Sequence, residues 1–131
     1  MAPSISDYAE AKLLDAVFNS APFCVTGDPY VSLHTGAPSE AAGSDGTEIV
    51  GGSYARKQVS WVNATSGAGT LDNSKHAFFT NMPACTLTHV GIWDAASAGN
   101  QLWSGALTTS KVVNSGDSFE LGTGDIDVTL A

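Results

Sequence analysis

Positive charge is scarce in this sequence, and Lys and Arg are not clustered anywhere along it. Only 5 Lys and Arg stand against 13 Asp and Glu, which gives a net charge of −8 at pH 7. Proteins that bind nucleic acid or anionic membranes use grouped Lys and Arg to neutralise phosphates. We therefore expect neither nucleic acid nor a membrane surface as a partner.

Long apolar runs are also missing. A membrane-spanning helix needs about 20 consecutive apolar residues, and no run approaches that length. The opening residues, MAPSISDYAEAK, lack the basic stretch followed by an apolar stretch that marks a secretory signal. These absences predict a chain that does not cross a membrane and is synthesised in a cytosol.

Cysteine is sparse, and its spacing fits no known cysteine motif. Cys24 and Cys85 lie far apart and lack the CxxC spacing of redox and zinc sites. We expect two buried thiols that act as small hydrophobic side chains. A disulfide between them would require an oxidising destination, so their redox state is left open.

The only helical pattern lies near the start, in SISDYAEAKLLDAVFNSAP (residues 4–22). Ser6 or Asp7 can serve as the N-cap, and Asn19, Ser20 and Pro22 end the helix. Apolar side chains share one face of this helix at Leu13, Leu14, Val17 and Phe18. We expect this face to pack either on the protein's own sheet or on a neighbouring subunit.

After residue 22 the pattern changes to short alternating runs separated by turn residues, which predicts strands. The expected strands are Tyr30–Thr35, Tyr54–Asn63, Ala77–Thr80, Thr86–Trp93, Gln101–Leu107, Ser118–Leu121 and Ile126–Leu130. This pattern predicts a mainly β fold: an antiparallel β-sandwich, jelly-roll-like, with one short N-terminal helix. The length of 131 residues fits one domain, with residues 1–22 as arm and helix and 23–131 as the sandwich.

Two of the strands form the clearest hairpin, THVGIWD and QLWSGAL joined by AASAGN. Gly99 and Asn100 are expected to supply the positive φ values of the connection. Gly91 and Gly105 can mark a bulge or a close approach of another chain segment. The first strand is expected to be central, because it is apolar on both faces: Leu87, His89, Gly91 and Trp93 on one, Val90 and Ile92 on the other.

Residues with catalytic or ligand-binding chemistry form no recognisable constellation. His34, His76 and His89 lack the close spacing of metal ligands, and the acidic turns around Asp125 and Asp127 suit turn formation and solubility. TSGAGT (residues 65–70) precedes neither a helix nor a lysine, so a hairpin turn is the better interpretation. We expect no enzyme activity, no metal and no cofactor.

Two alternatives from other classes remain open. A carbohydrate-binding module would present Trp61, Trp93 and Trp103 outward together, although tryptophans on strands more often lie in a core or an interface. A small hydrolase would need a cleft with convergent acids or a histidine, and no motif for one is present.

Four stretches resemble a family of small tailed-phage virion proteins, often labelled tail-fibre or minor tail proteins. They are DYAEAKLLDAVF, then YVSLHTGAPSEA with GTEIVGGSYARKQVSW, then THVGIWDAASAGNQLWSGALTTSKVVNSGDSFEL, and finally GDIDVTL. The most specific parts are GGSYAR and the THVGIWDA segment. KHAFFTNMPAC departs from the family pattern, and QLW stands where LLW is common.

The resemblance implies a virion structural protein, synthesised in the host bacterial cytoplasm. We expect a homo-oligomer, most simply a trimer, that decorates the capsid by binding the major capsid protein. A minor tail or tail-fibre protein, able to bind host glycans, is the alternative. The subunit or shell contacts are expected at Ser4, Ile5, Tyr8, Leu14, Phe18, Ser39, Glu40, Thr47 and Glu48.

Overall fold

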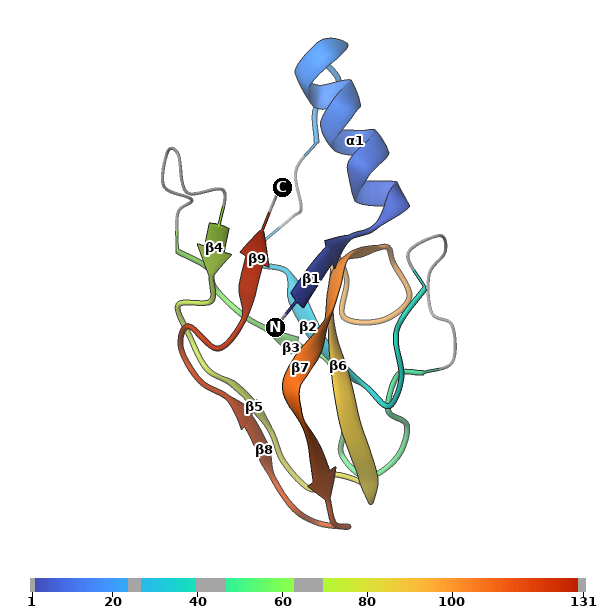
Figure 1. The fold of residues 1–131 in the computed structure, drawn as a ribbon, viewed down its shortest axis with the longest axis vertical. Coiled ribbons are helices and arrows are strands. Elements are labelled where there is room, and N and C mark those ends of the chain that lie inside the picture. The colour runs from blue at the N-terminus through green and yellow to red at the C-terminus, as the bar shows by residue number, and fades with distance from the viewer. Residues whose placement is uncertain (1, 24–26, 40–46, 63–69, 130–131) are drawn as a thin grey trace.

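The computed structural model describes residues 2–23, 27–39, 47–62 and 70–129. The helix and strands of this part are shown in Figure 1. In chain order they are β1 (Ala2–Ile5), α1 (Asp7–Phe18), β2 (Tyr30–His34), β3 (Lys57–Gln58), β4 (Thr70–Asp72), β5 (Ala77–Phe79), β6 (Cys85–Trp93), β7 (Gln101–Val113), β8 (Phe119–Leu121) and β9 (Asp127–Thr129).

The strands form three antiparallel sheets. The largest has the order β1-β7-β6-β2-β3, and the two smaller sheets are the pairs β4-β9 and β5-β8. These sheets and the single described helix confirm the predicted fold class, and the jelly-roll connectivity stays a prediction. Because β1 pairs with β7, residues 2–5 belong to the main sheet.

Two strands were not expected, and one expected strand is much shorter. β1 contains Pro3 and pairs through residues 2–5 at the sheet edge, where a proline is tolerated. β4 begins at Thr70, in the stretch expected to be a turn, whose other residues lie outside the described part. The strand expected over residues 54–63 is reduced to β3, because Tyr54 and Arg56 turn into a buried polar network.

Helix α1 begins at the predicted cap. The Ser6 hydroxyl oxygen accepts a hydrogen bond from the Ala9 amide, and the hydroxyl donates to the Gln101 carbonyl of β7. The Asn19 amide closes the last turn on the Asp15 carbonyl, and Ser20 follows with φ +55°. Ser6 therefore caps the start of α1 and also anchors the helix to β7.

The apolar face of α1 does not pack on the protein's own sheet. Leu14, Val17 and Phe18 are 60%, 73% and 77% exposed, and among the described helix residues Ala9 is the buried one. Figure 1 shows why: α1 leaves the end of β1 and extends beyond the sheets.

The β6–β7 hairpin is the centre of the fold, as expected. β6 pairs with β7 on one side and β2 on the other. Positive φ values in its loop occur at Ala98 (+51°) and Gly99 (+75°), so the expectation for Asn100 was wrong. Asn100 instead donates its amide and side-chain N–H groups to the Asp94 carboxylate, which closes the loop.

A register shift changes which face Leu87 occupies. Between Leu87 and His89, β6 advances two residues while β7 moves five, from Lys111 to Ala106. Leu87 consequently joins the same hydrophobic core as Val90 and Ile92, so the predicted placement with His89 was wrong. Simple alternation fails wherever one strand carries extra residues.

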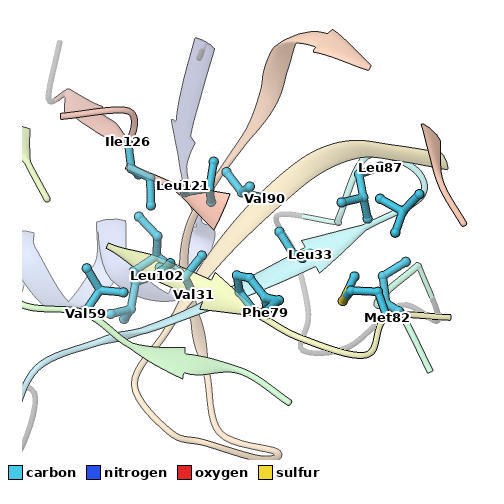
Figure 2. Packing of buried hydrophobic residues seen from close by; sticks show 14 of the residues in the cluster. Val31, Leu33, Val59, Phe79, Met82, Leu87, Val90, Leu102, Leu121 and Ile126 are labelled. Atoms are coloured by element: carbon cyan, nitrogen blue, oxygen red, sulfur yellow. The ribbon is translucent and has the colours of Figure 1, made fainter. Parts of the chain in front are cut away.

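The hydrophobic core lies between the main sheet and the β5-β8 pair (Figure 2). Phe79 and Ala77 from β5 and Leu121 from β8 meet side chains of the main sheet. The buried set also includes Val31, Leu33, Ile49, Val59, Met82, Leu87, Val90, Ile92, Leu102, Val113 and Ile126. This core holds the hairpin and the residues around it in fixed positions.

Candidate functional site

The most densely bonded polar site in the described part of the chain is built around Arg56. Its Nε and Nη2 donate to the two carboxylate oxygens of Glu48, both at 2.9 Å. Its Nη1 donates to the carbonyls of Ala95 (3.1 Å) and Ala98 (2.8 Å) in the hairpin loop. The guanidinium also stacks on the Trp93 ring, 3.8 Å from its centroid. Arg56 thus ties the hairpin loop to the segment that carries Glu48.

Tyr54 extends this site toward the core. Its hydroxyl donates to Glu48 Oε2 at 2.8 Å and accepts from the Leu33 amide of β2 at 3.0 Å. Its ring stacks on Phe79 with centroids 5.8 Å apart. Burial, together with the neighbouring Glu48 carboxylate, raises the pKa of Tyr54 well above its ordinary value, so the hydroxyl keeps its proton.

His34 connects the same region to β6. Its Nε2 lies 2.6 Å from Ser32 Oγ, and its Nδ1 lies 2.8 Å from Thr47 Oγ1. Trp93 Nε1 donates to the same Ser32 hydroxyl at 2.8 Å. Ser32, His34 and Trp93 are all buried, so this chain of hydrogen bonds is shielded from water.

Gly91 lies directly against the side chains of this chain of hydrogen bonds. A Cβ at this position would lie 2.5 Å from Ser32 Oγ and 2.9 Å from both His34 Nε2 and Trp93 Nε1. A side chain here must therefore displace the groups that form the hydrogen bonds.

We predict that Gly91→Ala destabilises the protein by about 1–3 kcal/mol through overpacking. The measurement is urea unfolding of the two proteins at pH 7. Gly36→Ala is the matched control, because its Cβ would meet Thr47 Cγ2 at an ordinary 3.4 Å. Equal stabilities for the two variants would show that the approach at Gly91 is not restrictive.

Glu48 is ionised at neutral pH because of its partners. Burial by itself raises its pKa, but the hydrogen bonds from Arg56 and Tyr54 and the Arg56 charge outweigh it, so the pKa of Glu48 lies below the ordinary 4.5. A carboxyl whose pKa is lowered by folding stabilises the folded state above its unfolded pKa, and this contribution disappears as the pH falls through the folded pKa.

We therefore predict that the free energy of unfolding decreases below pH 4.5, with a contribution from Glu48 of at most about 1.4 kcal/mol per pH unit. Unfolding curves for the unchanged protein and for Glu48→Gln between pH 7 and pH 3 isolate this contribution. The variant should be less stable at pH 7 and should lose less stability on acidification. Parallel pH profiles would contradict the prediction.

A pocket of about 400 Å³ lies beside this network, between the hairpin loop and the segment from Glu48 to Arg56. It is lined by Glu48, Ile49, Tyr54, Ala55, Arg56, Ala96, Ser97 and Ala98. Its charged side chains already bond to each other and to loop carbonyls, which suits holding a loop in place. No group of three or more potential metal ligands occurs among the residues that the structure describes.

The residues expected to contact partners lie in two parts of the chain, residues 4–18 and residues 39–48. Ser4 and Ile5 lie on β1, and Tyr8, Leu14 and Phe18 lie on α1. Thr47 and Glu48 bond inward to His34 and Arg56, while the Ser39 carbonyl accepts from Gln101 Nε2. Glu40 lies outside the described residues.

The remaining candidate residues are dispersed. Trp93 is buried beneath Arg56 and cannot join an outward tryptophan surface, whereas Trp61 and Trp103 are half-buried. His76 forms an exposed ion pair with Glu120, and His89 contacts Thr88.

The cysteine prediction is only partly tested. Cys85 is a free and half-buried thiol, so the expectation of full burial was wrong for it. Burial raises its pKa above the ordinary value, which makes the thiol less reactive. Cys24 lies outside the described residues.

The network itself was not predicted from the sequence. Its residues come from YVSLHT, GTEI, GGSYAR and GIWDA, all within the stretches that carry the family resemblance. The signal that could have found it is the combination of one arginine in an acidic chain with a nearby glutamate and a strand tryptophan. Arginine is the side chain suited to bidentate binding of a carboxylate together with stacking on an aromatic ring.

The fold and the site together define the class of protein: a small, mainly β protein whose buried polar groups bond chiefly to one another. Comparison with known families shows to which family the chain belongs. The model of the family described as Podophage GP4 fiber I protein gp80 matches residues 4–129, nearly the whole chain. The chain belongs to this family of phage fibre proteins and is a virion structural component. No curated protein matches it.

No helix in the described ranges is long and apolar enough to span a membrane.

Proposed function

We propose that the protein is a structural component of a phage tail fibre that works by association and carries out no reaction. The observation that supports this most directly is the match to a fibre family over residues 4–129. The site agrees with a structural role, because Arg56 and Glu48 satisfy each other and hold the hairpin loop. The fibre assignment replaces capsid decoration as the preferred location, since nothing in the family description points to the shell.

The surface we propose for association is the exposed face of α1, formed by Leu14, Val17 and Phe18. Large aliphatic and aromatic side chains contribute roughly 100–200 Å² each when they are buried, so these three offer a few hundred Å². The largest exposed apolar patch of a monomeric protein has about this size and is often functional. We propose a second and third copy of the chain as the partners, which would form a homotrimer.

Gold-labelled antibody against the recombinant protein, imaged by electron microscopy on intact virions, tests the location. Labelling confined to the tail or its fibres supports the proposal. Labelling spread over the head would overturn it in favour of capsid decoration and a contact with the major capsid protein. Preimmune antibody on the same virions is the control.

A further inference from the structure

The hydrogen bonds around His34 determine which ring nitrogen carries its proton. Trp93 Nε1 can only donate, so the Ser32 hydroxyl oxygen accepts from it. The acceptor within reach of that buried hydroxyl's own proton is His34 Nε2, 2.6 Å away, and from this we infer that Nε2 is the unprotonated nitrogen. The ring proton therefore sits on Nδ1 and is donated to Thr47 Oγ1 at 2.8 Å. The arrangement fits a neutral imidazole.

We propose that His34 is an acid-sensitive latch that joins β2, β6 and the segment from Thr47 to Ile49. A second proton would occupy Nε2 and turn that atom from an acceptor into a donor. The Ser32 oxygen has lone pairs for both Trp93 Nε1 and His34 Nε2, but its own proton, which is buried, would lose its acceptor.

The contacts of His34 explain what the latch holds. The segment from Thr47 to Ile49 pairs with β2 through the bridge between His34 and Glu48 and through the bond from the Ile49 amide to the Leu33 carbonyl at 3.0 Å. Glu48 in turn holds Arg56, which binds the hairpin loop. Protonation of His34 thus weakens the pairing of the Thr47–Ile49 segment with β2. Because Glu48 lies on this segment, the position of Arg56 is weakened as well.

Ionisable groups on each neighbouring segment bear on this proton. Glu48, its bridge partner, favours an imidazolium, but both of its oxygens already accept from Arg56 and Tyr54. The Arg56 guanidinium opposes a second positive charge nearby. His89 lies opposite His34 in the register of β6. The other ionisable side chains are Cys85 on β6 and Lys57 on β3, with Tyr30 on β2 itself.

The test uses a protein with His76→Gln and His89→Gln, in which His34 is the one remaining histidine of three. Urea unfolding is measured from pH 8 to pH 5. We expect a constant unfolding equilibrium constant above pH 7 and a rise that approaches tenfold per pH unit between pH 6 and pH 5, because an unfolded histidine titrates near about pH 6.5. The matched control adds His34→Gln and should lack this rise. A flat profile with His34 present would overturn the proposal.

A second measurement applies even where His34→Gln fails to fold. Imidazole ¹⁵N chemical shifts of the folded protein report the tautomer directly. We expect the Nδ1–H neutral pattern from pH 8 down to the onset of unfolding. An Nε2–H pattern, or reversible protonation of the ring in the folded protein without loss of stability, would contradict the latch. Neither outcome depends on the proposed fibre function.

Discussion

Replacing Arg56 with alanine should destabilise the protein by about 3–5 kcal/mol, because it leaves the mostly buried Glu48 carboxylate without its partner. The same change removes two hydrogen bonds to the hairpin loop and the stacking on Trp93. Urea unfolding at pH 7 measures the loss. Arg56→Lys should be intermediate, since an ammonium group keeps the charge but cannot bind both carboxylate oxygens in a planar fork.

A double-mutant cycle with Glu48 tests the physical cause. If the uncompensated carboxylate causes most of the loss, Arg56→Ala combined with Glu48→Gln should cost clearly less than the sum of the two single changes. Additive losses would show that the pair is not coupled. A loss below about 1 kcal/mol for Arg56→Ala alone would place this pair with weak surface ion pairs and contradict the assigned role.

Replacing Phe79 with alanine should cost about 3–5 kcal/mol, because it empties the centre of the core. Phe79 is fully buried, and its ring supports Tyr54 by stacking. The change therefore removes apolar burial and also frees the side chain that positions Glu48. Thermal or urea unfolding measures the loss.

The adjacent residue provides the matched control. Phe78 lies on the opposite face of β5 and is 50% exposed. Phe78→Ala should change stability much less, by about 0.5–1 kcal/mol, since half of this side chain stays in water in the folded protein. Similar losses at the two positions would mean that the core is not where the structure places it.

The sequence predicted the fold well wherever the order of apolar and polar residues in a strand depends only on which side chains are buried. The alternation in residues 30–35 and 86–93 identified β2 and β6, and apolar residues on both faces identified β6 as a central strand. Ser6 identified the start of α1, because a cap is a local signal. Gly91 was correctly singled out as a place of close approach.

The predictions fail where contacts between distant parts of the chain override the local pattern of apolar and polar residues. β1 forms because an edge position on β7 is open to it, which residues 2–5 do not encode. The displacement of Leu87 depends on extra residues in β7, a strand that lies later in the chain. The Arg56 network joins four separate segments, so neither spacing nor periodicity could reveal it.

His34 shows the same limit for a candidate site. Spacing did not distinguish the three histidines, yet His34 is the buried one with both ring nitrogens bonded. The difference arises from Thr47, which only the folded chain brings to the ring, and from Ser32, which also accepts from Trp93. Residue type alone did not distinguish the three histidines. The topology of the fold determines which of them is buried and hydrogen-bonded.

Light scattering of the purified protein tests the central claim, association through α1, most directly. The unchanged protein should form a trimer, and the double change Val17→Ser with Phe18→Ser should give a folded monomer. Val112→Ser is the matched control, because Val112 is equally exposed but lies on β7, and it should remain trimeric. A monomer at every concentration for the unchanged protein, or an unchanged oligomer after the helix substitutions, would contradict the account.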